Sequence, residues 1–118
     1  MVESDFFIVA CREGNISYVK KCINENFDPS CNGSAAIVHA CASGHIDIVK
    51  LLMEDNRIDI NAYDGRACLL AIENDNILKM LMSDTRFIMT DILAEDENVI
   101  NMLYQIRQEK LNELIKII

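Results

Sequence analysis

The apolar positions of this chain follow the period of α-helices, in short runs that recur about every 30 residues. In the middle of the chain, Ile37, Ala40 and Cys41 fall at i, i+3 and i+4, and a second apolar stripe follows over residues 48–52. These spacings place side chains on one face of a helix. Gly44, between the two runs, suits the left-handed conformation that often ends a helix. The pattern predicts two short helices joined by a tight turn.

This two-helix unit occurs three times. Residues 10–16 (ACREGNI) return as 40–46 (ACASGHI) and, less regularly, as 71–77 (AIENDNI). In the third unit Asp75 replaces the glycine and two residues are deleted, so we expect a shortened second helix there. A helix pair of this size cannot bury its apolar face alone, so neighbouring units must stack into a solenoid.

The repeats predict a single all-α domain over residues 1–118. We expect three repeats, at about 5–33, 34–64 and 65–90, followed by a C-terminal helical cap at 91–118. Asp5 is expected to cap a first helix that runs to about Glu13. Phe6 and Phe7 should fill the core position that Ile37 and Cys68 occupy in the later units.

The C-terminal segment has a wider apolar face than a cap requires. Thr90 or Asp91 can cap a short helix, and residues 99–118 contain no helix breaker, which predicts a long terminal helix. Its apolar arc spans about 220°, whereas a capping helix needs a stripe of little more than about 100°. Three explanations stay open: a homodimer, a bend near Gln105 that folds the segment back, or a chain that is a fragment of a longer protein. The residues left uncovered are Leu111, Leu114, Ile115 and Ile118.

Composition narrows the class of protein. The chain has 118 residues, 51% of them hydrophobic, and a formal net charge of −8, which disfavours nucleic acid as a partner. No apolar run is long enough to span a membrane, and the acidic N-terminus does not resemble a signal peptide. Five cysteines without paired spacing indicate buried thiols in a reducing compartment, so we expect a cytoplasmic protein.

The residues show no catalytic or metal-binding constellation. Cys41 lies near His39, His45 and Asp47 in the sequence, but His39 and Cys41 are two residues apart and point to opposite sides of a helix. The histidines and cysteines lack zinc-ligand spacing, the acidic run at 95–97 lacks the pattern of a calcium loop, and four glycines form no phosphate loop. We expect neither cofactor nor metal, and a cysteine-dependent enzyme is a remote alternative.

The chain resembles the ankyrin repeat family. Residues 35–52 (AAIVHACASGHIDIVKLL) follow the family pattern TPLHxAAxxGHxxVVxxLL, and residues 59–62 (DINA) resemble its DVNA ending. The resemblance covers roughly residues 5–90. Ala35 and Ala36 replace Thr-Pro, Val38 replaces the histidine, and the period of 30 or 31 residues is shorter than the family's 33. Short, divergent arrays of this kind are similar to those of amoebae and large DNA viruses.

The resemblance implies a non-catalytic module that binds a partner protein in its concave groove, as an adaptor or a decoy, in the host cytoplasm if the chain is viral. The negative charge favours a partner with a basic or neutral surface. A self-assembling structural subunit that dimerises through the C-terminal helix is the alternative. Tyr63 and Arg66 are of the types that dominate binding hot spots. The groove positions carried over from the family are Arg12, Glu13, Asn32, Ser34, Ser43, Tyr63, Asp64, Arg66, Glu73 and Asn74.

Overall fold

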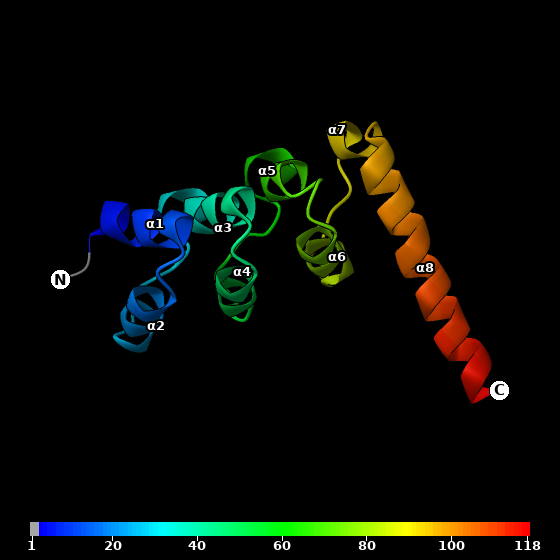
Figure 1. The fold of residues 1–118 in the computed structure, drawn as a ribbon, viewed down its shortest axis with the longest axis horizontal. Coiled ribbons are helices and arrows are strands. Elements are labelled where there is room, and N and C mark those ends of the chain that lie inside the picture. Colours follow the sequence, from blue (N-terminus) through cyan, green and yellow to red (C-terminus); the bar gives the residue numbers. More distant parts are fainter. Residues whose placement is uncertain (1–2) are drawn as a thin grey trace.

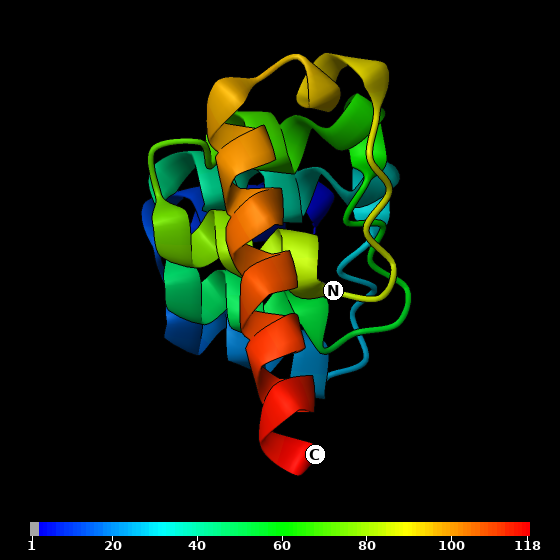
Figure 2. The same ribbon diagram turned by 90° about the vertical axis from the view of Figure 1, so that its right-hand side faces the viewer.

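The computed structural model describes residues 3–118, which form eight helices and no strand. The first helices of the successive units, α1, α3 and α5, lie side by side in one row, and α2, α4 and α6 lie in a second row below them (Figure 1). The view from the C-terminal end shows α8 crossing the end of the stack (Figure 2). The expected all-helical solenoid is confirmed. The helices are α1 (Ser4–Glu13), α2 (Ile16–Asn24), α3 (Cys31–Ser43), α4 (Ile46–Met53), α5 (Ala62–Leu70), α6 (Asp75–Ser83), α7 (Asp91–Ala94) and α8 (Glu97–Ile117).

Glycine ends the first helix of the first two units, as expected. Gly14 and Gly44 have φ angles of 83° and 76°, in the left-handed region that is nearly free of strain for glycine. At Gly14 the absence of a side chain also makes room for the next unit. A Cβ there would lie 2.8 Å from the imidazole of His45, whose Nε2 is 2.9 Å from the carbonyl oxygen of Arg12.

The irregularity of the third unit lies in its first helix, so the prediction of a shortened second helix is wrong. Helix α6 has nine residues, as many as α2. The chain is left-handed from Tyr63 to Gly65, so regular helix in α5 is confined to residues 66–70, and Ala71 ends it. The side chain of Asn74 accepts the Ile77 N–H and thereby caps α6. The two-residue deletion therefore shortens the first helix, because the connection to α6 (residues 71–74) is longer than the two-residue connections 14–15 and 44–45 of the earlier units.

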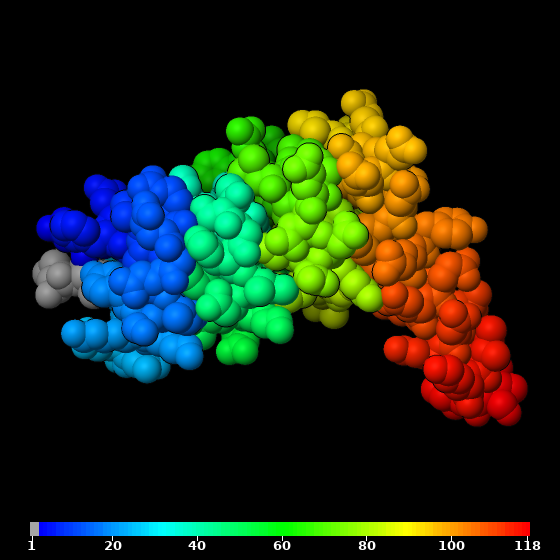
Figure 3. Space-filling model, viewed as in Figure 1, coloured from blue at the N-terminus to red at the C-terminus, as the bar shows by residue number. Residues whose placement is uncertain are grey.

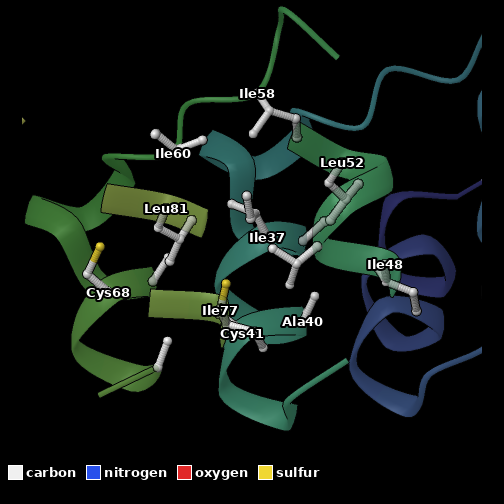
Figure 4. Packing of buried hydrophobic residues seen from close by; sticks show 14 of the residues in the cluster. Ile37, Ala40, Cys41, Ile48, Leu52, Ile58, Ile60, Cys68, Ile77 and Leu81 are labelled. Carbon is white, nitrogen blue, oxygen red and sulfur yellow. The ribbon is translucent and has the colours of Figure 1, made fainter. Parts of the chain in front are cut away.

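The apolar core runs through the stack without a break between units (Figure 4). Ile37 and Ala40 of α3, and Ile48 and Leu52 of α4, are fully buried between the neighbouring units. Leu51 belongs to the apolar stripe over residues 48–52, which predicts that it is buried like Leu52, but it is only half-buried. The side chain of Leu51 lies about 100° around the axis of α4 from that of Leu52, so it is turned away from the fully buried face of the helix.

At the N-terminus, Phe7 occupies the core as expected. The expectations that Phe6 is also buried and that Asp5 caps the first helix are wrong. Phe7 is fully buried and packs on Phe27, with 4.7 Å between the ring centroids. Phe6 is 62% exposed because it lies 100° around α1 from Phe7, on a side that no other described helix covers. The residue at the N-cap of α1 is Glu3, which forms no side-chain cap, and Asp5 lies within the first turn.

The C-terminal region forms a short helix and one straight long helix. Thr90 accepts the N–H of Leu93 at the start of α7, and Asp96 caps α8. Helix α8 is continuous through Gln105, so of the three explanations left open, the bend that would fold the last segment back is wrong. Val99, Met102 and Ile106 are buried on its inner face, which contacts α6 and α7. The last turns project beyond the repeats (Figure 3).

Polar contacts at the outer ends of the second helices connect successive units. Arg86 forms two hydrogen bonds of 2.9 Å with the carboxylate of Asp84 in its own unit, which hold the pKa of Asp84 below its ordinary value. Its guanidinium also donates to the Met53 carbonyl at 2.7 Å and to the Asp55 and Ile58 carbonyls at 3.3 Å. Arg57 makes the equivalent contact to the preceding unit, a 3.5 Å hydrogen bond to the Phe27 carbonyl, but is more exposed.

Burial of α4 gives a first prediction. Leu52→Ala should lower the free energy of unfolding by about 2–5 kcal/mol, because it leaves a cavity between neighbouring units. Leu51→Ala should cost less than half as much, because this side chain is only half-buried. Urea melts of both variants measure the difference. Equal losses at the two sites would contradict the packing described for α4.

Arg86 gives a second prediction. Arg86→Lys should lower the free energy of unfolding at pH 7 by about 2 kcal/mol, because one ammonium cannot reproduce the forked contacts to Asp84 and three carbonyls. The loss should shrink as the pH falls below about 4, since the lowered pKa of Asp84 stabilises the fold only while this carboxylate is ionised. Arg57→Lys is the matched control and should change the urea midpoint much less. Equal effects of the two substitutions would show that the three carbonyl contacts of Arg86 add nothing to the stability.

Candidate protein-binding surface

A depression of about 410 Å³ lies between α3 and the turn that leads into α5. Three of the residues predicted for the groove, Tyr63, Asp64 and Arg66, line one side of it. The opposite side is formed by one face of α3. The lining residues are Ala35, Val38, His39, Tyr63, Asp64 and Arg66.

The turn that carries Tyr63 has an uncommon backbone conformation. Tyr63 and Asp64 have φ angles of 54° and 56°, in the left-handed region that side chains other than glycine seldom adopt. Gly65 continues the turn, and a Cβ there would lie 2.8 Å from the Leu93 side chain of α7. The preceding unit makes the same left-handed turn at residues 32–34. Each turn is closed by a backbone hydrogen bond, from the Ser34 N–H to the Ser30 carbonyl and from the Gly65 N–H to the Asn61 carbonyl.

The two turns are joined through Tyr63. Its hydroxyl donates a 2.7 Å hydrogen bond to the carbonyl oxygen of Asn32, and its ring lies next to Gly33. The side chain is nevertheless 58% exposed. Tyr63 thus holds one turn on the next and still presents much of its ring to the depression.

The charges of the depression are available to a ligand. Arg66 and Asp64 are exposed, and neither forms an ion pair within residues 3–118. His39 is half-buried on the α3 side and adds an imidazole. The depression therefore combines an aromatic ring, a guanidinium, a carboxylate and the apolar side chains of α3.

Ser34 does not belong to the exposed surface. It is 2% exposed, because the left-handed turn directs it inward, and its hydroxyl accepts the N–H of Asp59 at 2.9 Å. Asn74 is also structural, since its side chain caps α6. These two predicted groove residues stabilise the turns between helices instead.

Of the remaining predicted residues, Asn32 is exposed in the left-handed turn at residues 32–34, where its carbonyl accepts the Tyr63 hydroxyl. The other four lie at the opposite end of the first helices. Arg12 and Glu13 at the end of α1 are exposed and form an ion pair of 3.6 Å with each other. Ser43 at the end of α3 and Glu73 after α5 are exposed as well. About 12 Å of helix separates residue 43 from residue 35, so this patch is distinct from the depression near Tyr63.

The residues that form the α3 side of the depression were not predicted from the sequence, although the pattern of buried positions in α3 indicates them. The buried residues Ala36, Ile37, Ala40 and Cys41 occupy an arc of about 140° on a helical wheel. Ala35, Val38 and His39 fall outside this arc, on the face left for a ligand. Comparing the two faces would have found His39, which the sequence presents mainly as a neighbour of Cys41.

The thiols do not support nucleophilic chemistry. Burial raises the pKa of Cys11, Cys41 and Cys68 to about 12, the opposite of what a reactive cysteine needs. Within residues 3–118, no three His, Cys, Asp or Glu side chains lie close enough together to hold a metal ion. No helix in this part of the chain is both long and apolar enough to cross a membrane.

Comparison with known proteins agrees with this architecture. Ankyrin repeats, in three copies, match residues 6–96. The BTB/POZ domain-containing protein 3 of Schizosaccharomyces pombe is 34% identical over 80 residues, which cover 63% of this chain and 15% of that protein. No solved structure is significantly similar to the chain. With three stacked helix pairs and a family match over most of its length, the chain belongs to the ankyrin repeat family.

Proposed function

We propose that the chain binds a partner protein through the depression formed by α3 and the turn before α5. Ankyrin repeats generally mediate interactions between proteins, and no enzyme family matches this chain. The observation that carries the proposal is the combination of an exposed, rigidly held Tyr63 with the unpaired charges of Asp64 and Arg66 around one hollow. Tyrosine and arginine supply most of the energy in many protein interfaces.

The partner we propose has a basic or neutral surface and is neither nucleic acid nor membrane. The net charge of −8 steers basic proteins toward the chain and repels phosphate groups. Binding without catalysis fits an adaptor, or a decoy that sequesters its target. All five cysteines are free and four are buried, which supports the expected location in a reducing cytoplasm.

The groove proposal is tested by changing its charges without touching the contacts that hold the turns. Arg66→Ala with Asp64→Asn should weaken partner binding at least about tenfold, or 1.4 kcal/mol, with little change in the melting temperature. Neither side chain forms a hydrogen bond within residues 3–118, and asparagine tolerates the left-handed conformation of residue 64. Tyr63→Ala is less suitable because it also removes the bond to Asn32.

The measurement is quantitative capture from a lysate of the source cells, with binding of each captured protein then measured on purified material. Lys20→Ala, an exposed basic residue on α2, is the matched control and should leave binding unchanged. Equal binding by the wild type and the groove variant would move the site away from this depression, for example to the patch around Arg12 and Ser43.

The reaction of the cysteines with a thiol reagent distinguishes a binding protein from a cysteine-dependent enzyme. We expect Cys31, the one cysteine that is not fully buried, to react first with a thiol reagent, and slowly, since burial raises its pKa as well. The other four should react only as the protein unfolds. A fast, stoichiometric reaction of one buried thiol in the native protein would favour the enzyme.

A further inference from the structure

The outer face of α8 carries an apolar stripe along its whole length that no described residue covers. Its members are spaced alternately four and three residues apart, the pattern of a coiled-coil seam, and all are exposed. They span about 80° on a helical wheel, and Ile115 widens this arc to about 100°. We call this face the outer stripe. It consists of the apolar residues Ile100, Tyr104, Leu111, Leu114 and Ile118, with the charged Arg107 in its middle.

The outer stripe is separate from the face that closes the repeats. Val99, Met102 and Ile106 of the inner face are buried against α6 and α7, and Glu109 forms a 2.7 Å ion pair with Lys79 of α6. These contacts fix the rotation of α8, so that the outer stripe points away from the repeats. The last turns of α8 also project beyond the body of the molecule (Figure 3).

We propose that a second copy of the chain covers the outer stripe, with the two α8 helices packed antiparallel about a centre near residue 109. In this register, Ile100 of one copy faces Ile118 of the other and Tyr104 faces Leu114. Arg107 faces Leu111, and its long stem allows its charge to reach water at the edge of the pair. A parallel pair would place Arg107 against its own copy.

The distribution of charge along the chain favours a second copy as the partner of α8, in the antiparallel orientation. Residues 107–118 carry three basic and two acidic side chains, a net charge of +1, whereas the rest of the chain carries −9. The nearly neutral ends of α8 can therefore approach each other. An antiparallel pair also holds the two acidic repeat bodies at opposite ends of the dimer, where their repulsion is smallest.

The apolar area is close to what a specific interface requires. Burying one exposed aliphatic side chain removes roughly 60–120 Å² of apolar surface, so the four aliphatic residues of the outer stripe, with the ring of Tyr104 and the stem of Arg107, give about 500 Å² for each copy. The total of roughly 1,000 Å² lies at the lower limit for a biological interface. We therefore expect a reversible dimer whose formation depends on concentration.

Sedimentation equilibrium of the 118-residue chain tests the proposal. The mass should rise from the 13.4 kDa of the monomer toward twice that value between about 10 μM and 1 mM. Leu114→Glu should weaken the dimer at least about thirtyfold, because each copy would bury a charge at the interface. The matched control is Ile117→Glu, since Ile117 is 81% exposed but lies 100° around the helix from Ile118, outside the outer stripe. This control should change the dissociation constant less than about threefold.

The orientation is tested separately by disulfide cross-linking. Arg107→Cys and Leu111→Cys proteins should each form few cross-links alone, whereas an oxidised mixture should link residue 107 of one copy to residue 111 of the other, as mapped by mass spectrometry. Efficient cross-linking of Arg107→Cys with itself would overturn the antiparallel arrangement. A protein that stays monomeric at 1 mM, or equal weakening by Leu114→Glu and Ile117→Glu, would overturn the dimer through the outer stripe.

Discussion

Every helix pair in this protein depends on its neighbour, because no pair can bury its own apolar face. Ile37 and Ile48 become fully buried only where adjacent units close on them, and this dependence propagates along the stack to α8. Stability in such a chain is a sum of local units and of the interfaces between them. The small side chains of Ala40 and Cys41 are buried in this core and leave room for neighbouring helices to pack closely (Figure 4).

Polar contacts then fix the position of each unit on the next one. Arg86 binds the carboxylate of its own unit and three carbonyls of the preceding unit, and Tyr63 and His45 reach backbone oxygens one unit away. The family pattern places a Thr-Pro-Leu-His motif at the start of each unit, and here arginine, tyrosine and a differently placed histidine join the units. Repetition of these contacts at intervals of about 30 residues keeps the loops of successive units in register although the repeat period is short.

The candidate site follows from this same register. The left-handed turns lie at equivalent points of successive units, so Tyr63 is carried onto the Asn32 turn and placed opposite the free face of α3. Tyr63 both joins the two turns and lines the hollow, whereas Asp64 and Arg66 form no ion pair within residues 3–118. The outer stripe of α8 arises differently. This helix has two apolar faces, and only the inner one, with Val99, Met102 and Ile106, packs against the end of the stack.

The sequence by itself determined the period, the helical class, the long terminal helix and the positions of the glycine caps, because these depend on spacing along one chain. It also placed Tyr63, Asp64 and Arg66 near one another, since they belong to one turn. Only the tertiary structure decided that Ser34 turns inward, that Leu51 lies at an edge and that His39 faces the hollow. A side chain's burial depends on the rotation of its helix against a neighbouring unit, and this rotation is set by contacts between residues about 30 positions apart.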